Sequence, residues 1–292
     1  MGDSPTPSAI PASGYYHLTC SRTVQPHLVS SFRRSVVIAA LVWASFASAQ
    51  VLPQKLDDSL DISFAIPNYF QDYAAAGGNP RPEVGRLLLY LPKQFNPRGS
   101  YPVLAVTSTT DKGRTSTMDA PMYRAVATQE GWIVLATAAR IRPKIDSTAW
   151  RAGVLAAGLD LMHRDWPASR TWPVVFAGLS GGAKRSCWMA AMLAQTKSVK
   201  MAGLFLAGMN EDRMGEAIHD YPTTTELLAA PIWMSCGRHD PIAPPEFQRQ
   251  TQASLKHLGF RQVELSQFDG GHEVDPADLR RALRWFRTKG NF

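Results

Sequence analysis

The stretch that most constrains this chain is an apolar run followed by a glycine-framed serine, Trp172-Pro-Val-Val-Phe-Ala-Gly178-Leu-Ser180-Gly-Gly182. A short continuous apolar run is typical of a buried strand, and the residues after Ser180 have helical spacing. Gly178 and Gly182 lack a Cβ, so they allow strand and helix to pass close to each other around a cramped serine. The pattern predicts a sharp strand-to-helix turn that lifts Ser180 above the end of a sheet. Ser180 is therefore a candidate nucleophile, and a plain small-residue turn is the alternative.

The first 49 residues have the pattern of an export leader. Arg33-Arg34 precedes a short apolar run at 36–44, and Ala47-Ser48-Ala49 follows as a cleavage site. We therefore expect a signal peptide at 1–49 with an atypically long n-region before the apolar run, and an exported mature protein, periplasmic or secreted, at 50–292. The apolar run is short for a stable membrane span, although an uncleaved anchor, a twin-arginine signal and a later start site stay open.

Export places the remaining thiols, Cys187 and Cys236, in an oxidising compartment. Their separation in sequence leaves both a disulfide and two buried free thiols open. The formal net charge is +7, from 31 Lys and Arg against 24 Asp and Glu. No basic run has interleaved aromatic residues, so the sequence does not predict nucleic-acid binding. The oligomeric state is not encoded in these patterns.

The mature chain alternates between strand and helix patterns. Strands are expected at 62–66, 85–92, 101–107 and 131–137, then ending at Ser180, and at 201–207, 231–236 and 262–268. Helices are expected at 120–130, 147–165, 181–196, 245–258 and 276–289, with a turn-rich segment at 68–82 and a short connection through Pro222. Continuous apolar strands separated by helices predict an α/β fold with a mostly parallel sheet, helices on both faces and no large cap domain. Such sheets carry their sites at the carboxyl ends of the strands.

A serine nucleophile needs a base, and the base needs an orienting acid. Asp240 follows the strand expected at 231–236, and His272 lies in a glycine-rich loop after the strand expected at 262–268. Both therefore fall at the sheet edge that carries Ser180. The sequence predicts a triad in which Ser180 attacks, His272 transfers the proton and Asp240 orients the imidazole.

Other polar residues near the predicted triad have simpler interpretations. His239 is expected to be a loop residue, and Asp269 and Glu273 are expected to make local loop hydrogen bonds. A metal site from His239, Asp240, His272 and Glu273 is an alternative, but it lacks a short helical histidine spacing. His163 and His219 are expected at the surface or in loops. Trp188 and the methionines of the helix after Ser180 are expected to be core residues, because they follow helical spacing.

An acyl-transfer site also needs hydrogen-bond donors for the oxyanion. The amide of Gly181, beside the nucleophile at a helix N-terminus, is the first candidate donor. The second is expected from Thr109 or Thr110, in the loop after the strand at 101–107.

These motifs, in the order Ser180, Asp240, His272, resemble the α/β-hydrolase superfamily over essentially the whole mature region. The leader, the absence of a large cap and the Gly-Leu-Ser-Gly-Gly turn are similar to exported esterases near the feruloyl-esterase, polyhydroxyalkanoate-depolymerase and dienelactone-hydrolase-like groups. The resemblance implies hydrolysis of a small-molecule or polymer-derived carboxylic ester without a cofactor. A His-Gly pair, often found in this fold at the second oxyanion donor, is absent. A serine peptidase, a lipase and an inactive binding protein of the same fold remain alternatives.

Overall fold

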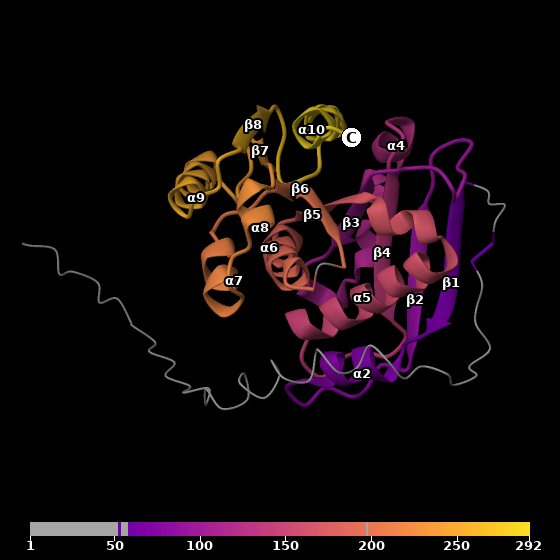
Figure 1. Ribbon diagram of the computed structural model, residues 1–292. Helices are drawn as coiled ribbons and strands as arrows, with labels where there is room; N and C mark the ends of the chain where they lie inside the picture. Colours follow the sequence, from indigo (N-terminus) through magenta and orange to yellow (C-terminus); the bar gives the residue numbers. More distant parts are fainter. Residues whose placement is uncertain (1–51, 54–57, 197) are drawn as a thin grey trace, which may run out of the picture. The chain divides into compact units, whose positions relative to one another are not determined.

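The computed structural model describes residues 52–53, 58–196 and 198–292, which belong to one compact unit, Gln50–Phe292 (Figure 1). The export leader expected at 1–49 lies outside the described residues. Within the described part, no helix has both the length and the apolar character needed to cross a membrane.

The described residues form an eight-stranded sheet in the order β1-β2-β4-β3-β5-β6-β7-β8. Only β2 runs against its neighbours β1 and β4, and the other neighbouring strands are parallel. The strands are β1 (Ser59–Ala65), β2 (Val84–Tyr90), β3 (Val103–Thr107), β4 (Ile133–Ala139), β5 (Pro173–Leu179), β6 (Lys200–Ala207), β7 (Ile232–Gly237) and β8 (Val263–Phe268). The mostly parallel sheet predicted from the continuous apolar runs is thus confirmed.

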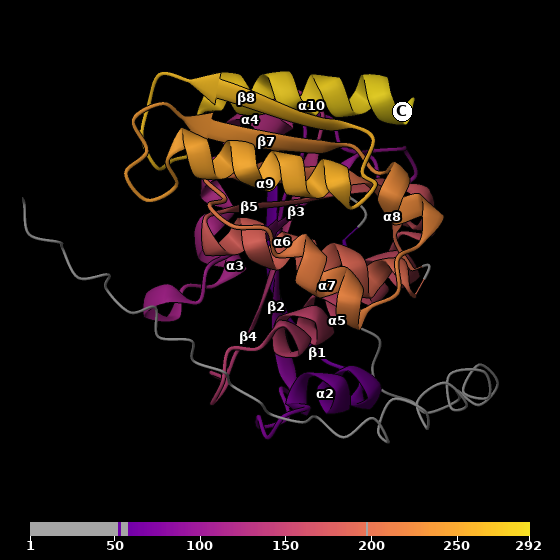
Figure 2. The ribbon, with the colours of Figure 1, turned by 90° about the vertical axis from the view of Figure 1, so that its left-hand side faces the viewer.

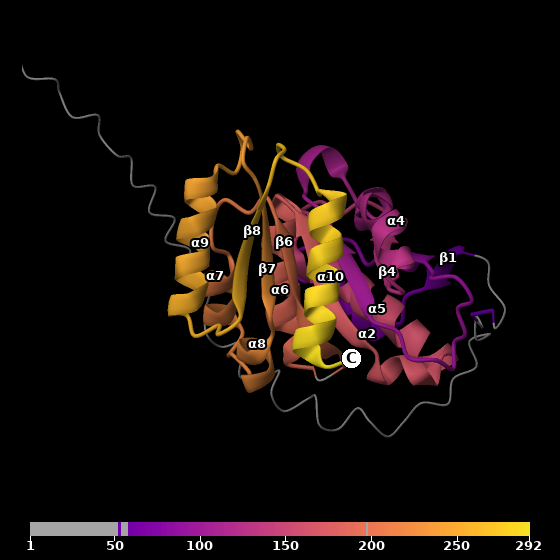
Figure 3. The ribbon, with the colours of Figure 1, turned by 90° about the horizontal axis from the view of Figure 1, so that it is seen from above.

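Helices cover both faces of the sheet, and a separate hydrophobic core lies on each face. Side chains from α5 (Thr148–Asp165), α6 (Gly181–Ala194) and α9 (Pro245–His257) belong to one core. Side chains from α4 (Pro121–Gln129) and α10 (Pro276–Gly290) belong to the other. Figures 2 and 3 show β7 and β8 between α9 and α10. These five helices are the ones that the sequence predicts, with ends shifted by a few residues.

The segment at 68–82, predicted to be turn-rich, begins with α2 (Asn68–Ala75), so the prediction is wrong there, and it is confirmed for the turn that follows at 76–82. No side chain caps this helix at its N-terminus. Its stability comes from packing on α5, where a Cβ on Gly153 would lie 2.9 Å from the Cβ of Ala74. The close approach of the two helices is a tertiary contact, which local sequence signals do not report.

The connection through Pro222 is not a plain loop either, because it contains α7 (Met214–Asp220) and α8 (Thr225–Ala229). The Asp212 carboxylate accepts the Met214 amide at 2.7 Å at the start of α7. The Thr224 hydroxyl accepts the Leu227 amide at 3.1 Å and caps α8. Short elements also follow β3 and α5: η1 (Asp111–Gly113), α3 (Ser116–Asp119) and η2 (Pro167–Thr171).

Candidate functional site

Ser180 stands in the sharp turn between β5 and α6, as the sequence predicts. Its backbone has φ 58° and ψ −121°, a conformation that non-glycine residues rarely adopt. Such strain costs about 1–3 kcal/mol and persists only where the surroundings enforce it. Here the Ser180 amide donates a 2.8 Å hydrogen bond to the carbonyl of Ala207 at the end of β6. The serine is therefore held in place by the neighbouring strand.

The two glycines that frame Ser180 are required by close backbone contacts. A Cβ on Gly178 would lie 2.2 Å from the carbonyl carbon of Gly182, and a Cβ on Gly182 would lie 2.5 Å from the carbonyl oxygen of Thr107. The Thr107 hydroxyl donates at 2.6 Å to the carbonyl of Gly182, which ties the end of β3 to the first turn of α6. A larger residue at either glycine would push the strand and the helix apart.

Asp240 and His272 come together at the same edge of the sheet. The Nδ1 atom of His272 lies 2.7 Å from Oδ2 of Asp240. The Asp240 side chain is 1% exposed and that of His272 is 16% exposed. Oδ1 of Asp240 accepts the amides of Ile242 and Ala243, both at 2.8 Å. The carboxylate is thus fixed on both sides, and it sets the orientation of the imidazole.

The loops that carry Asp240 and His272 are joined by their backbones. The Arg238 amide donates to the carbonyl of Phe268 at 3.0 Å, and the His239 amide donates to that of Gly270 at 2.9 Å. Gly237 allows this contact, because a Cβ there would lie 2.1 Å from the carbonyl oxygen of Gly271. The acid and the histidine therefore sit on one rigid double loop after β7 and β8.

Gly208 brings His272 to the side of the serine turn. This residue follows Ala207, the hydrogen-bond partner of the Ser180 amide. A Cβ on Gly208 would lie 2.8 Å from Cε1 of His272 and 3.3 Å from a side-chain carbon of Leu179, the residue before Ser180. Among the described residues the Ser180 hydroxyl makes no hydrogen bond with His272. Catalytic hydrogen bonds are often loose before substrate binds, so this geometry is compatible with a nucleophile and base.

The loop after β3 packs on the first residue of α6. A Cβ on Gly181 would lie 2.6 Å from Oγ1 and 3.3 Å from Cα of Thr109. Within the described part of the chain, the amides of Thr109, Thr110 and Gly181 have no hydrogen-bond acceptor. Three backbone donors are thus available near the serine turn, from the two segments that the sequence predicts.

Arg151, in the first turn of α5, orients the loop after β3. Its guanidinium donates to the carbonyls of Ser108 at 3.3 Å, Thr109 at 3.2 Å and Arg114 at 2.8 Å, and also to the Ser108 hydroxyl. The C=O and N–H of a trans peptide point in opposite directions. The carbonyls of Ser108 and Thr109 face Arg151, so the amides of Thr109 and Thr110 face away from it. Sequence reasoning missed this residue.

A partly buried cluster of charges supports Arg151. Asp146 accepts its Nε at 2.7 Å and its Nη2 as well. A second guanidinium, that of Arg185 in α6, lies 3.8 Å from the same carboxylate. Burial and the charge of Arg151 lower the pKa of Arg185 to about 10. Two guanidinium groups and one carboxylate leave a net positive charge behind the loop, which favours a developing negative charge in front of it.

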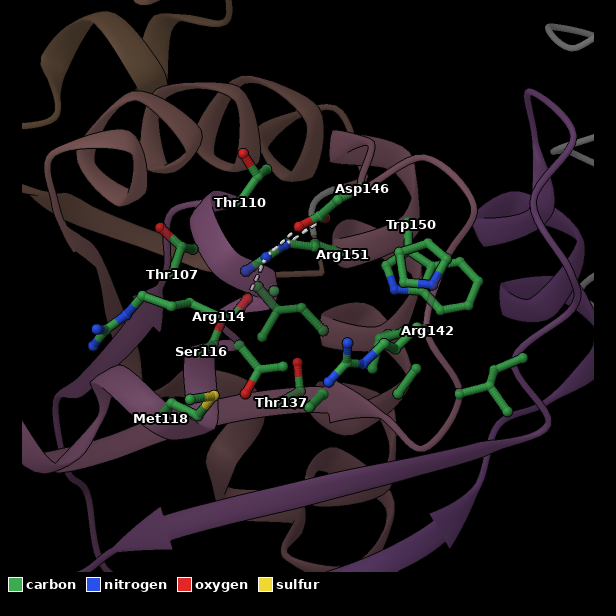
Figure 4. A pocket seen from close by; sticks show the side chains of 18 of the residues that line it. Thr107, Thr110, Arg114, Ser116, Met118, Thr137, Arg142, Asp146, Trp150 and Arg151 are labelled. Atoms are coloured by element: carbon green, nitrogen blue, oxygen red, sulfur yellow. Dashed lines mark hydrogen bonds and ion pairs between the residues drawn. The ribbon is translucent and has the colours of Figure 1, made fainter.

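A cavity of about 410 Å³ opens beside the loop that follows β3 (Figure 4). Thr107 and Thr110 line it, whereas Ser180 and His272 do not. Its other walls come from α3, the end of β4, the segment at 140–146 and α5. Thr110 belongs both to the cavity and to the candidate oxyanion loop, so the cavity adjoins the serine site.

Several further sequence expectations concern residues outside the candidate triad. His239 lies in an exposed loop and pairs with Asp269 at 3.0 Å, and Glu273 accepts the amide of Gly271 at 3.2 Å, which confirms their local roles. His219 is exposed on α7. His163 was expected at the surface or in a loop and is instead buried in α5, where burial lowers its pKa. The reason is that α5 is covered on most sides, by the sheet and by α2, α6 and η2.

The predicted core residues and thiols of α6 are also placed. Met189 and Met192 are buried and Trp188 packs against the same core, as expected. Cys187 and Cys236 are both buried and free, which decides the thiol question in favour of free thiols. Burial raises the pKa of Cys236 to about 11, so this thiol is unreactive. Among the described residues, no group of three His, Cys, Asp or Glu side chains could hold a metal ion.

No protein-family model matches the chain, and no curated protein matches its sequence. Solved structures match its architecture. The Pyrococcus furiosus esterase Pf2001 has a TM-score of 0.54 at 12% identity, covering 80% of this chain and 92% of that chain. A bacterial heroin esterase has a TM-score of 0.55 at 16% identity, covering 80% and 85%. Thermogutta terrifontis esterase 2, phosphorylated by paraoxon, has a TM-score of 0.52 at 14% identity, covering 70% and 89%. Together with the strand order and the serine turn, these likenesses show that the chain has the α/β-hydrolase fold.

Proposed function

We propose that this protein is a serine hydrolase that cleaves carboxylic esters through an acyl-enzyme on Ser180. The observation that carries the proposal is the partly buried His272–Asp240 pair, joined at 2.7 Å and set beside the strained serine turn by Gly208. The esterases of the same fold support the choice of reaction.

In the proposed reaction, the Ser180 hydroxyl attacks the ester carbonyl while Nε2 of His272 accepts its proton. Asp240 accepts the Nδ1–H of His272, so Nε2 is the free basic nitrogen of the imidazole. The Asp240 carboxylate also stabilises the imidazolium that forms. The tetrahedral intermediate carries its negative charge on the former carbonyl oxygen. The amide of Gly181 and that of Thr109 or Thr110 donate to this oxyanion.

Collapse of the intermediate breaks the bond to the alcohol oxygen. His272 returns its proton to that oxygen, and the alcohol leaves. A water molecule then attacks the acyl-enzyme while His272 accepts one of its protons. The second tetrahedral intermediate collapses by breaking the bond to Oγ of Ser180, His272 returns its proton to that oxygen, and the acid leaves.

Two measurements on the mature protein test this proposal. We expect hydrolysis of p-nitrophenyl acetate and covalent labelling of Ser180 by a fluorophosphonate, located by peptide mass spectrometry. Ser180→Ala should abolish both and leave the melting temperature nearly unchanged. Labelling at another residue, or hydrolysis by Ser180→Ala at the parent rate, would rule out this nucleophile.

The same experiments separate the competing functions. An inactive binding protein of this fold would give neither hydrolysis nor labelling. A peptidase would be labelled and would also cleave peptide p-nitroanilides. A lipase would show higher activity on long-chain esters above their solubility limit than on p-nitrophenyl acetate.

A further inference from the structure

The cavity beside the loop that follows β3 contains polar groups that no protein atom satisfies. Ser116 and Thr137 line it and are buried, being 7% and 8% exposed. Within the part of the chain that the structure describes, neither hydroxyl makes a hydrogen bond. Their hydroxyl groups are therefore free to donate to a ligand that enters the cavity.

Arg142 supplies a charge to the same cavity. Its guanidinium reaches η1, since a Cβ on Gly113 would lie 3.7 Å from its Nη1. Figure 4 shows the side chains of Ser116, Thr137 and Arg142 gathered at one side of the cavity. One guanidinium and two hydroxyls are together a donor set that suits a carboxylate.

The nearby acids do not neutralise this charge. Asp119 pairs with Arg114, and Asp146 pairs with Arg151. Three cations in the segment after β4 have no ion pair with a described residue: Arg140, Arg142 and Lys144. An anionic group that enters the cavity therefore meets an uncompensated positive charge.

The inner wall of the cavity is apolar. Val154 and Leu155 from α5 and Met189 from α6 line it, and all three are buried. The cavity thus suits a ligand with an apolar segment that ends in an anion. Its volume of about 410 Å³ lies within the range of small-molecule sites.

We propose that this cavity binds a carboxylate carried by the ester substrate, with Arg142 as its charged partner and Ser116 and Thr137 as hydroxyl donors. The proposal rests on the esterase function given above. Thr110 connects the two sites, because it lines the cavity and belongs to the loop that would hold the oxyanion. An ester with its carbonyl at Ser180 can therefore extend past Thr110 into the cavity.

Matched substrates test the proposal, with one pair for each side of the ester. On the acyl side, the p-nitrophenyl monoester of glutarate is compared with p-nitrophenyl pentanoate. On the alcohol side, 4-acetoxybenzoate is compared with its methyl ester. We expect kcat/KM to favour the anionic member of one pair by about 10- to 100-fold, the range for one charge-assisted contact. Preference for the neutral member in both pairs, or no preference in either, would overturn the proposal.

Substitution of Arg142 assigns the preference to the cavity. Arg142→Gln should reduce the ratio of anionic to neutral kcat/KM to about one. Arg261→Gln is the matched control, because Arg261 is exposed and precedes the edge strand β8, whereas the cavity adjoins the inner strands β3 and β4. This control should keep the parent ratio. An unchanged ratio in Arg142→Gln would refute the assignment.

A binding measurement separates this proposal from the hydrolase function. Glutarate is titrated calorimetrically into the Ser180→Ala protein, which has no turnover in the proposed mechanism. Saturable binding that Arg142→Gln abolishes supports the cavity site even if no ester is hydrolysed. Hydrolysis of neutral esters with labelled Ser180, but without glutarate binding or anionic preference, would refute the cavity site and keep the hydrolase.

Discussion

Replacement of Arg151 by lysine tests whether this guanidinium orients the proposed oxyanion donors. Arg151→Lys keeps the positive charge beside Asp146, but an ammonium group cannot reach several carbonyls with one rigid fork. The parent guanidinium contacts the carbonyls of Ser108, Thr109 and Arg114. We expect the lysine to keep its ion pair and to lose most of these carbonyl contacts.

The expected losses of unfolding free energy and of kcat follow from those contacts. Charge-assisted hydrogen bonds contribute about 1.5–3 kcal/mol each, but the freed carbonyls can bind water in a partly buried site. The variant should therefore lose about 1–3 kcal/mol of unfolding free energy and remain folded. Loss of one oxyanion donor costs about 100- to 1,000-fold in kcat, so a donor that is merely loosened should cost about 10- to 100-fold.

The assay measures kcat and KM on p-nitrophenyl acetate for the parent protein and for Arg151→Lys. The unfolding free energy of both proteins is measured separately. A positioning role predicts a lower kcat with KM changed less than about threefold, because the oxyanion forms only in the transition state. Phe260→Leu is the control, chosen to lose a similar amount of unfolding free energy. Phe260 is buried in the segment that connects α9 to β8, away from the site. The reasoning fails if Arg151→Lys keeps kcat within twofold, or if the control loses as much.

Three further predictions concern Asp240, the contact of Gly208 with His272, and the buried His163. Asp240→Asn should keep the fold, because the amide oxygen can still accept the amides of Ile242 and Ala243. It should lower kcat by about 10⁴-fold, because the asparagine NH₂ would fix the wrong tautomer of the His272 imidazole. A loss of kcat under tenfold would contradict this role of Asp240. Gly208→Ala, at φ +54°, should lower kcat far more than it lowers the melting temperature, because the new Cβ would lie 2.8 Å from the His272 ring; equal kcat would refute this placement. Burial lowers the pKa of His163 in the folded protein, so on acidification the unfolded chain takes up a proton at this residue first. The unfolding free energy should therefore fall as pH drops below about 6.5, toward the pKa of His163 in the folded protein. Denaturant titrations should find that the unfolding free energy depends less on pH in His163→Gln, and an equal dependence would contradict this prediction.

The regular part of the fold was predictable because its signals are local. The strand before Ser180 is continuously apolar, and the turn at Ser180 contains two obligatory glycines. One short window of residues therefore determines both the strand and the turn. The helix α2 was not predictable, because it has no cap and depends on packing against Gly153, far along the chain. Likewise, His163 has the polarity of a surface residue, and only the placement of α5 makes it buried.

The candidate site divides in the same way. Asp240 and His272 follow recognisable strands, so the parallel sheet brings them to one edge without knowledge of side chains. The cavity depends on how residues 140–146 fold over η1, and no periodicity encodes that path. The free state of Cys187 and Cys236 is also a matter of distance between elements.

Arg151 did leave one signal in the sequence. It lies in the first turn of α5, where the helix dipole disfavours a positive charge, and it is followed by a run without charged residues up to Asp160. A cation at such a position needs compensation, which Asp146 before the helix and the carbonyls of the loop after β3 provide. Because each bound carbonyl turns the amide of its own peptide the other way, the compensation itself aims donors away from the helix. An arginine that binds the back of the loop can therefore replace a glycine-rich sequence in front of it, and the loop Thr107-Ser108-Thr109-Thr110 needs no His-Gly pair to present its amides.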